Sequence, residues 1–188
     1  MSSHLVIAKI GTIEELRRSA TSDDMHLVEA FGSENRQREA LAWRAIVRRE
    51  LGAECRISYD EWGAPQVDLP NTFISVSHSK EQVAVLFSDA PCAVDIEQTE
   101  RDFARVASRY LSDNEQSLAE LHKLHAELWC AKEALYKYHK RGGLDLRRDI
   151  KIVEYDSEKS RFVATILDGE DIEVALSRQA DIVVAQIG

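Results

Sequence analysis

Apolar positions recur with two different periods along this chain, and each period predicts a different kind of element. Short runs in which apolar residues alternate with polar ones, or follow one another without a break, predict β-strands. We expect strands at residues 5–10, 55–60, 65–69, 73–79, 82–89, 92–98, 150–155, 161–167, 171–177 and 181–188. Apolar residues spaced by three and four positions predict helices at residues 33–52, 102–111 and about 113–140.

The order of these elements favours an α+β fold in two parts. Each half of the chain runs from helix into antiparallel strands, although no residue-level repeat is visible. We therefore expect two similar lobes, an N-terminal lobe of residues 1–90 and a C-terminal lobe of residues 91–188. No Pro-rich or Ser-rich linker lies between them, so we expect one compact unit whose cleft binds a ligand.

Composition narrows the class of protein. The 188 residues are 44% hydrophobic and 30% charged, with 3 Pro and 8 Gly, which is typical of a folded soluble chain. A net charge of −9 argues against general nucleic-acid binding, because that binding requires Lys and Arg to neutralise phosphates. We found no apolar run of membrane-spanning length and no secretion signal, so we expect a cytoplasmic protein without membrane contact. The 3 Cys lack metal-ligand spacing and are expected to be reduced core residues.

Two carboxylates lie close together in the apolar run CAVDIEQ, residues 92–98. Alternate side chains of a strand point to opposite faces, so Asp95 and Glu97 share one face while Val94 and Ile96 share the other. Neighbouring anions cost free energy unless one is protonated or a cation lies between them. The alternative interpretation is an exposed strand end that leads into a helix.

The helix expected at about 113–140 carries a third carboxylate. Its apolar stripe is formed by Leu118, Leu121, Leu124, Leu128, Ala131, Leu135 and Tyr138. Off this stripe, Trp129, Glu133 and Lys137 follow at i, i+4 and i+8, with Lys132 beside Trp129. Alone, the Glu133 and Lys137 pair indicates a surface ion pair. Together with the two strand carboxylates it indicates the oxygen-rich site that Mg²⁺ prefers, with substrate phosphates as further ligands.

Two further segments bear on an anionic ligand. Residues 123–151 are rich in Lys and Arg, which indicates either a solvated helix face or a local basic patch. The segment SVSHS, residues 75–79, places hydroxyl side chains on both sides of His78. This histidine is either an exposed polar residue or part of a phosphate grip.

These segments together resemble the Sfp-type 4′-phosphopantetheinyl transferase family. The family carries a serine-histidine-serine strand end, then a valine-aspartate-isoleucine-glutamate strand, then a helix with a tryptophan, a lysine-glutamate pair and a further lysine. Here the three read ISVSHS at 74–79, AVDIE at 93–97 and WCAKEALYK at 129–137. The GGL at 142–144 is similar to the segment that follows this helix in the family, and the resemblance spans about residues 33–150.

The resemblance implies two similar α/β lobes related by a pseudo-twofold axis, with coenzyme A bound between them. It also implies transfer of the 4′-phosphopantetheine arm of coenzyme A to a serine of an acyl or peptidyl carrier protein, with release of 3′,5′-ADP. Mg²⁺ is the implied cofactor. We expect a monomer, because one chain supplies both lobes.

The same resemblance implies roles for individual residues. The implied metal ligands are Asp95, Glu97 and Glu133. The implied coenzyme contacts are Arg38 at the 3′-phosphate, with Arg36 or Arg44 as alternatives, Ser77 and His78 at the nucleotide end, and Lys132. The implied catalytic residues are Glu133 and Lys137. Glu133, directly or through metal-bound water, is the candidate base, and Lys137 either stabilises phosphate charge or protonates the leaving group.

Some features leave alternatives open. The family often has a glycine-lysine-proline turn where this chain has Gly63, Ala64 and Pro65, so one coenzyme contact is missing. A carrier protein is expected to dock on Arg101, Phe103, Arg105, Arg109 and Tyr110, or near Lys140 and Arg141, although core packing is the alternative for Phe103, Val106 and Tyr110. The other functions that fit are a Mg²⁺-dependent nucleotide or coenzyme A phosphohydrolase, and a non-catalytic homologue that binds carrier proteins.

Overall fold

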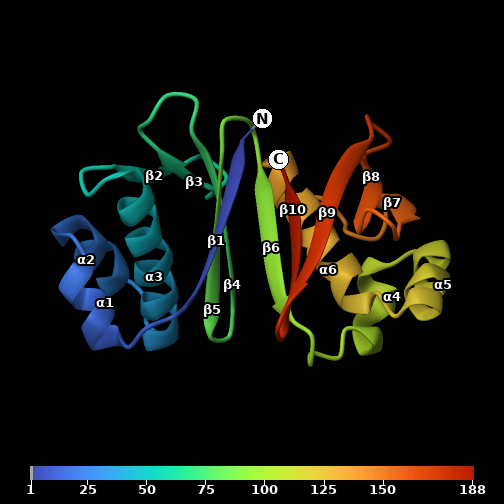
Figure 1. Cartoon of the computed structure of the whole chain (residues 1–188), viewed down its shortest axis with the longest axis horizontal. Coiled ribbons are helices and arrows are strands. Elements are labelled where there is room, and N and C mark those ends of the chain that lie inside the picture. Colours follow the sequence, from blue (N-terminus) through green and yellow to red (C-terminus); the bar gives the residue numbers. More distant parts are fainter. Residues whose placement is uncertain (1) are drawn as a thin grey trace. The chain divides into compact units, whose positions relative to one another are not determined.

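The computed structural model describes residues 2–188, which separate into two compact units. The first unit ends at Ala90 and the second comprises Pro91–Gly188. Figure 1 colours the first unit from blue to green and the second from yellow-green to red. Both units contain helices and strands, so the mixed α and β content expected from the sequence is confirmed.

The first unit is an antiparallel sheet covered by helices. Its elements are β1 (Ser3–Lys9), α1 (Ile13–Ser19), α2 (Ser22–Glu29), α3 (Glu34–Leu51), β2 (Ile57–Tyr59), β3 (Pro65–Val67), β4 (Phe73–Ser79) and β5 (Gln82–Ser88). The main sheet has the order β1-β5-β4, and β2 pairs with β3 in a separate hairpin. One side of helix α3 contacts strand β5, and its other side contacts helices α1 and α2, as Figure 1 shows.

Helix α3 forms because its apolar residues recur on one side. Ile46 and Val47 pack with Val83 and Val85 of β5 to form the core of this unit. Burying these apolar side chains contributes about 1.5–3 kcal/mol each. The helix stops at Gly52, whose φ of 107° is accessible to glycine and strained for other residues.

The second unit contains a larger antiparallel sheet. Its elements are β6 (Ala93–Gln98), the 3₁₀ turn η1 (Ala104–Val106), α4 (Ala107–Tyr110), α5 (Asp113–His122), α6 (His125–His139), β7 (Ile150–Asp156), β8 (Arg161–Ile166), β9 (Ile172–Gln179) and β10 (Ile182–Ile187). The sheet order is β6-β10-β9-β8-β7. Helix α6 lies against β6 and β10, and its Leu128 and Leu135 share a core with Val183 and Ala185 of β10.

The two units share one pattern of strand connection. In each, the first strand pairs antiparallel with the last strand, β1 with β5 and β6 with β10. The neighbour on the other side of the last strand is the strand that precedes it, β4 or β9. In each, the longest helix of the unit falls between the first strand and this closing hairpin.

Three expectations about helices need correction. The single helix expected at about 113–140 is two helices, because Lys123 ends α5 in the left-handed conformation with φ 55°. Leu121, expected in the core, is therefore 77% exposed. Helices α1 and α2 were not predicted at all, and the helix expected at 102–111 is only η1 followed by the single turn of α4.

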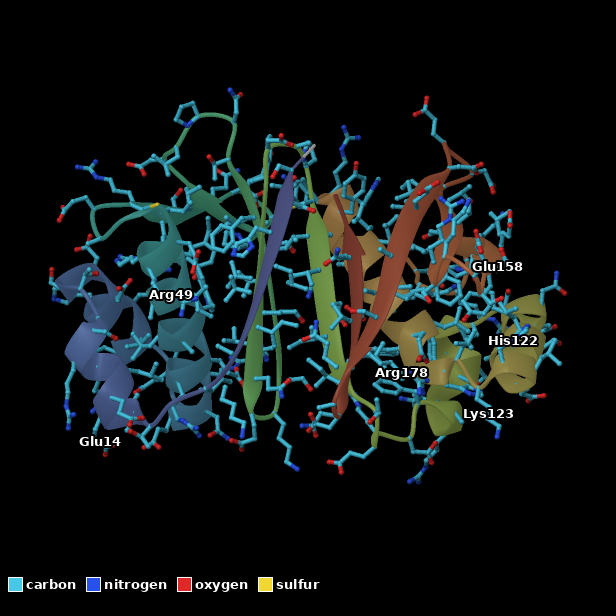
Figure 2. The ribbon with its side chains drawn as sticks, viewed as in Figure 1. Glu14, Arg49, His122, Lys123, Glu158 and Arg178 are labelled. Carbon is cyan, nitrogen blue, oxygen red and sulfur yellow. The ribbon has the colours of Figure 1, made fainter. Side chains whose placement is uncertain are left out.

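The surface of each unit carries most of the charge. The six residues labelled in Figure 2, from Glu14 on α1 to Arg178 on β9, are all exposed. The three cysteines are buried free thiols, as expected. None of the helices in residues 2–188 combines the length and the apolar character that a membrane span requires.

Candidate active site

Strand β6 presents two carboxylates toward helix α6. Ala93 of this strand lies in the same core as Ala131 and Ala134 of α6, and alternation along the strand puts Asp95 and Glu97 on that same face. Asp95 is buried, with 6% of its surface exposed. Val94 and Ile96 are also buried, and the same alternation puts them on the opposite face of the strand.

Helix α6 supplies a lysine that reaches this strand. The Nζ atom of Lys137 donates hydrogen bonds to Asp95 Oδ1 at 2.8 Å and to the backbone oxygen of Val94 at 3.0 Å. Glu133 lies one turn earlier on the helix and interacts electrostatically with both strand carboxylates and with Lys137. Asp95, Glu97, Glu133 and Lys137 therefore interact with one another in the second unit.

A second cation, Arg101, pairs with the other strand carboxylate, Glu97. The Nη1 atom of Arg101, in the loop after β6, donates to Glu97 Oε1 at 2.6 Å. The guanidinium carbon of Arg101 lies 5.6 Å from the Trp129 ring centre and 4.9 Å from that of Phe103. Each strand carboxylate thus has its own cation, Lys137 for Asp95 and Arg101 for Glu97.

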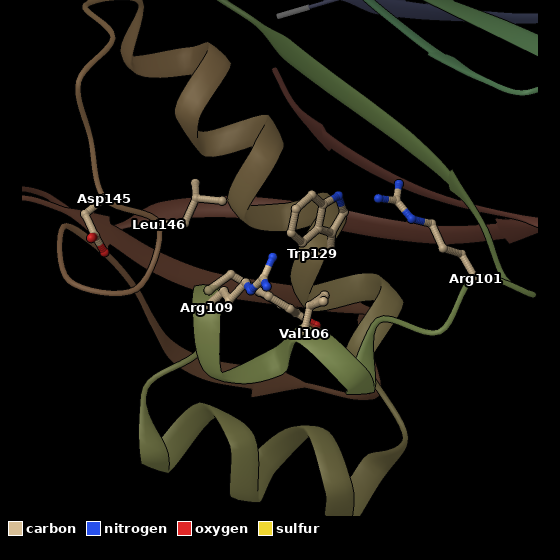
Figure 3. Close-up of a pocket in the computed structure, with 7 residues that line it drawn as sticks. Arg101, Val106, Arg109, Trp129, Asp145 and Leu146 are labelled. Carbon is tan, nitrogen blue, oxygen red and sulfur yellow. The ribbon is translucent and has the colours of Figure 1, made fainter.

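A pocket of about 310 Å³ opens next to Trp129. Figure 3 shows Arg101 extending toward the Trp129 indole, with Arg109, Asp145 and Leu146 on the other side of the ring. The pocket is lined by Arg101, Val106, Arg109, Tyr110, Trp129, Asp145 and Leu146. Its wall combines two guanidinium groups with apolar surface. Phe103 and Tyr110 are buried, so core packing is their main role, which was the alternative to a docking surface.

The two partly buried glutamates of this group have raised pKa values. Burial raises the pKa of Glu133, and the charge of Asp95 raises it further, while Lys137 opposes both effects. Burial likewise raises the pKa of Glu97, and the Arg101 guanidinium partly offsets this. Such shifts bring a glutamate closer to the range in which it can accept and return a proton near neutral pH.

Cys130 is the thiol nearest this group, and it is not a nucleophile. It is fully buried on α6 beneath the sheet. Burial raises its pKa well above the ordinary value, and the charge of Asp95 adds to the shift. Because the thiolate is the reactive form, this cysteine serves as a small core residue.

The donor set fits a magnesium ion in its chemistry. Mg²⁺ prefers carboxylate oxygens and keeps further positions for water and phosphate, and three carboxylates interact here. Within residues 2–188, no three His, Cys, Asp or Glu side chains are already arranged as a metal site. Asp95 and Glu97 are instead paired with Lys137 and Arg101. An ion entering this group would compete with those two cations.

Lys132 does not fit its expected role as a coenzyme contact. Its side chain is fully buried, and its Nζ atom donates to Glu115 Oε2, Leu146 O and Ile150 O, each at 2.8 Å. Burial lowers the pKa of this lysine, and the charge of Glu115 opposes the effect. All three of its donors are used inside the second unit, so we assign Lys132 a structural role.

The expected coenzyme contacts of the first unit lie on α3 and β4. Arg38 donates to the backbone oxygens of Gly11 at 3.0 Å and Ile10 at 3.3 Å. Ser77 is buried in β4, whereas His78 is exposed, with Nδ1 3.6 Å from Glu39 Oε1. Adjacent residues of a strand face opposite sides, so Ser77 and His78 do not form one grip.

Arg44, an alternative to Arg38, is committed to the interior of the first unit. Its Nε atom lies 2.5 Å from Asp24 Oδ1, and both side chains are buried. A buried guanidinium already paired with a carboxylate is not available to a phosphate. Arg36 is exposed at the start of α3 and keeps its place as the other alternative.

Two residues of the second unit were missed as partners in the sequence. Arg101 was considered only for docking, and it pairs with Glu97 across the turn after β6, where the helical spacing rule does not apply. Glu115, the partner of Lys132, is 17 positions away on another helix. No local pattern reveals that pair.

One family model and two curated proteins match part of this chain. The model of the 4′-phosphopantetheinyl transferase superfamily matches residues 91–186. The chain is 36% identical over 97 residues to the 4′-phosphopantetheinyl transferase ffp of Bacillus subtilis, covering 48% of this chain and 43% of that protein. It is 31% identical over 109 residues to the 4′-phosphopantetheinyl transferase Sfp of Bacillus subtilis strain 168, covering 53% and 49%. The chain thus matches slightly less than half the length of these curated relatives.

Proposed function

This chain belongs to the 4′-phosphopantetheinyl transferase superfamily, and we propose that it transfers the 4′-phosphopantetheine arm of coenzyme A to a serine of a carrier protein. The observation that carries the proposal is the group of facing charges on β6 and α6, with Lys137 Nζ 2.8 Å from Asp95 Oδ1. Every member of that group lies within the matched residues 91–186. The partners are coenzyme A and an acyl or peptidyl carrier protein.

The reaction exchanges one phosphorus–oxygen bond for another. The serine oxygen forms a bond to the phosphorus that carries pantetheine, and the bond from that phosphorus to the bridging oxygen breaks, which releases 3′,5′-ADP. Glu133 accepts the serine proton, a role that suits its raised pKa. Lys137 stabilises charge on the phosphate oxygens or protonates the departing oxygen.

Asp95, Glu97 and Glu133 would hold a magnesium ion in this proposal. Their carboxylate oxygens have the right chemistry, and their mutual repulsion gives the ion a place where positive charge stabilises the protein. When bound, the ion supplies neutralising charge for the pyrophosphate. Lys137 and Arg101 already pair with two of these carboxylates, so they compete with the ion for them.

The first unit contributes the proposed coenzyme contacts Arg38, Ser77 and His78. The shared order of strands in the two units supports the proposal that they are similar lobes, and the pseudo-twofold relation stays a prediction from the family resemblance. We further propose that the enzyme is monomeric and cytoplasmic and binds neither membranes nor nucleic acids. The net charge of −9 supports the absence of nucleic-acid binding, because the phosphates of nucleic acids would be repelled.

Release of 3′,5′-ADP from coenzyme A tests the proposed function. The protein is incubated with coenzyme A and Mg²⁺, with and without an apo carrier protein, and the nucleotide is quantified by chromatography. Release that requires the carrier supports the transferase. Equal release without any carrier would instead identify a phosphohydrolase, and no release with several carriers would leave only a binding protein.

A further inference from the structure

The two resident cations of the site are held very differently. Lys137 Nζ bonds to a buried carboxylate and also to a backbone oxygen, and its side chain is 32% exposed. The Arg101 side chain donates to Glu97 Oε1, and it is 56% exposed. An ion pair with one largely exposed partner is worth little, because water replaces it readily.

The Arg101 guanidinium has other favourable contacts that remain when it separates from Glu97. It lies against the rings of Phe103 and Trp129, which attract a cation through their faces. It also lines the pocket beside Trp129, as Figure 3 shows. Separation from Glu97 therefore requires only a rotation of an exposed side chain.

The Glu97 side chain is partly buried and requires a positively charged partner. This side chain is only 17% exposed, so its charged form needs a nearby cation, and Arg101 Nη1 supplies one at 2.6 Å. The Arg101 guanidinium, 2.6 Å from Glu97 Oε1, therefore fixes where this carboxylate points before any ion arrives.

We propose that Arg101 is a positioning residue that holds Glu97 in the metal-free protein and is displaced when a divalent cation binds. This inference rests on the proposed function, because it takes Glu97 as a ligand of that cation. Arg101 then acts as a built-in competitor, and its presence sets how much Mg²⁺ the protein needs. Lys137 remains on Asp95 throughout, since its two hydrogen bonds hold it there.

Calorimetric titration with Mg²⁺ tests this role directly. We would compare the unmodified protein with Arg101→Ala, Arg101→Lys and Arg105→Ala. Arg105 is an exposed arginine four residues further along, so its loss matches the change in net charge without touching the Glu97 pair. Arg101→Ala is expected to bind Mg²⁺ about threefold to fivefold more tightly, the size expected from losing one partly exposed ion pair.

The controls separate competition from a general effect. Arg105→Ala should leave the affinity within about twofold of the original, and Arg101→Lys should fall between the original and Arg101→Ala, because lysine keeps the charge without the planar fork. In the transfer assay, Arg101→Ala should reach half its maximal rate at a lower Mg²⁺ concentration. A merely structural arginine would act in the opposite direction, because its loss would loosen Glu97 and weaken metal binding.

The outcomes distinguish this inference from the function on which it rests. Equal or weaker Mg²⁺ binding by Arg101→Ala, in a protein that binds Mg²⁺ and transfers the arm, overturns the inference alone. If the unmodified protein binds no Mg²⁺ with or without coenzyme A, the proposed metal site fails and the competition role fails with it. A thermal melt of each variant establishes that the compared proteins are folded.

Discussion

At the scale of single residues, the candidate site is a balance of charges between one strand and one helix. Asp95 is tolerated in a buried strand because Lys137 lies 2.8 Å from it, and Glu97 is tolerated because Arg101 lies 2.6 Å from it. Glu133 interacts with both pairs, and its pKa is raised first by burial and then by the charge of Asp95. We propose Glu133 for the proton transfer because neither Lys137 nor Arg101 is needed to hold it, whereas Glu97 is paired with Arg101.

Replacing Glu133 with Gln should remove transfer while preserving the fold. The amide has the same shape but cannot accept the serine proton, so the rate should fall about 10²-fold to 10⁴-fold. The rate is measured by release of 3′,5′-ADP, and the fold by circular dichroism and thermal melting. A variant that turned over like the original would remove Glu133 from both the base and the metal roles.

Replacing Lys137 with Ala should reduce the rate more than it reduces coenzyme affinity. In the proposed reaction this lysine acts on charge that develops in the transition state, whereas the other proposed coenzyme contacts lie in the first unit. The matched control is Lys140→Ala, which removes the same charge one turn later on the chain. Steady-state kinetics decide the matter, and a change confined to KM would take Lys137 out of the chemical step.

The sequence was a better guide to the carboxylates than to Lys132. Alternation along a strand is enough to put Asp95 and Glu97 on one face. The signal for Lys132 was present but overlooked, because this residue is four positions after Leu128 and three before Leu135 and so lies on the apolar stripe. Its partner could not be found locally, since the pairing depends on how two helices pack.

At the scale of elements, the Glu115 and Lys132 pair joins four segments of the second unit. Lys132 on α6 bonds to Glu115 on α5 and to the backbone at Leu146 and Ile150. Glu115 also accepts the backbone N–H groups of Ser112 and Ile152. The pair therefore fixes the end of the segment after α6, where Asp145 and Leu146 line the pocket beside Trp129.

Replacing Lys132 with Met should destabilise the protein by about 3–5 kcal/mol, because it leaves a buried carboxylate without its cation. The double variant Lys132→Met with Glu115→Gln should recover part of that loss, since no uncompensated charge remains. The free energy of unfolding is measured by urea denaturation. If Lys132→Met kept full stability and instead weakened coenzyme A binding, the sequence-based assignment to the coenzyme would be right.

Local pattern explains both the helices that were found and those that were missed. Helix α3 was predictable because its apolar residues recur with helical spacing from Ala40 to Leu51. Helices α1 and α2 have only 7 and 8 residues, too few for a clear period, although each has a capping box, at Thr12 with Glu15 and at Thr21 with Asp24. The break at Lys123 could not be predicted, because lysine seldom adopts a left-handed conformation and does so here where two helices meet.

The Asp24 and Arg44 pair should make the stability of the first unit depend on acid. Burial alone would raise the pKa of Asp24, but hydrogen bonds from Arg44 and from Thr21 outweigh it and lower the pKa below 3.8. A lowered folded-state value means that the stabilisation is complete above the unfolded value near 3.8 and is lost as the pH falls through the folded value.

Asp24→Asn should therefore unfold about 3 kcal/mol more easily than the original protein at neutral pH. The difference between the two proteins should shrink as the pH is lowered below 3.8, where the original loses the same charge. Urea denaturation over this pH range measures both curves. A difference that stayed constant into acid would show that the charge of Asp24 is not the source of the stability.

At the scale of the whole molecule, one pattern of strand connection occurs in two units that differ in sequence. The pairing of the first strand with the last could be expected only in outline, because non-local pairing is not written in any short segment. The sequence indicated the proposed function more clearly than it indicated the strand connections. The residues that carry charge chemistry are concentrated in three short motifs, and two of them, on β6 and α6, fall within the matched superfamily region.

The measurement that tests the central claim most directly is the intact mass of an apo carrier protein after incubation with this protein, coenzyme A and Mg²⁺, with a chelator in the control. We predict that the carrier gains the mass of one 4′-phosphopantetheine arm, that the gain maps to a serine, and that the chelator prevents it. Unchanged carriers across fatty-acid, polyketide and peptide types, with coenzyme A intact and the protein folded, would contradict the claim that this chain is a transferase.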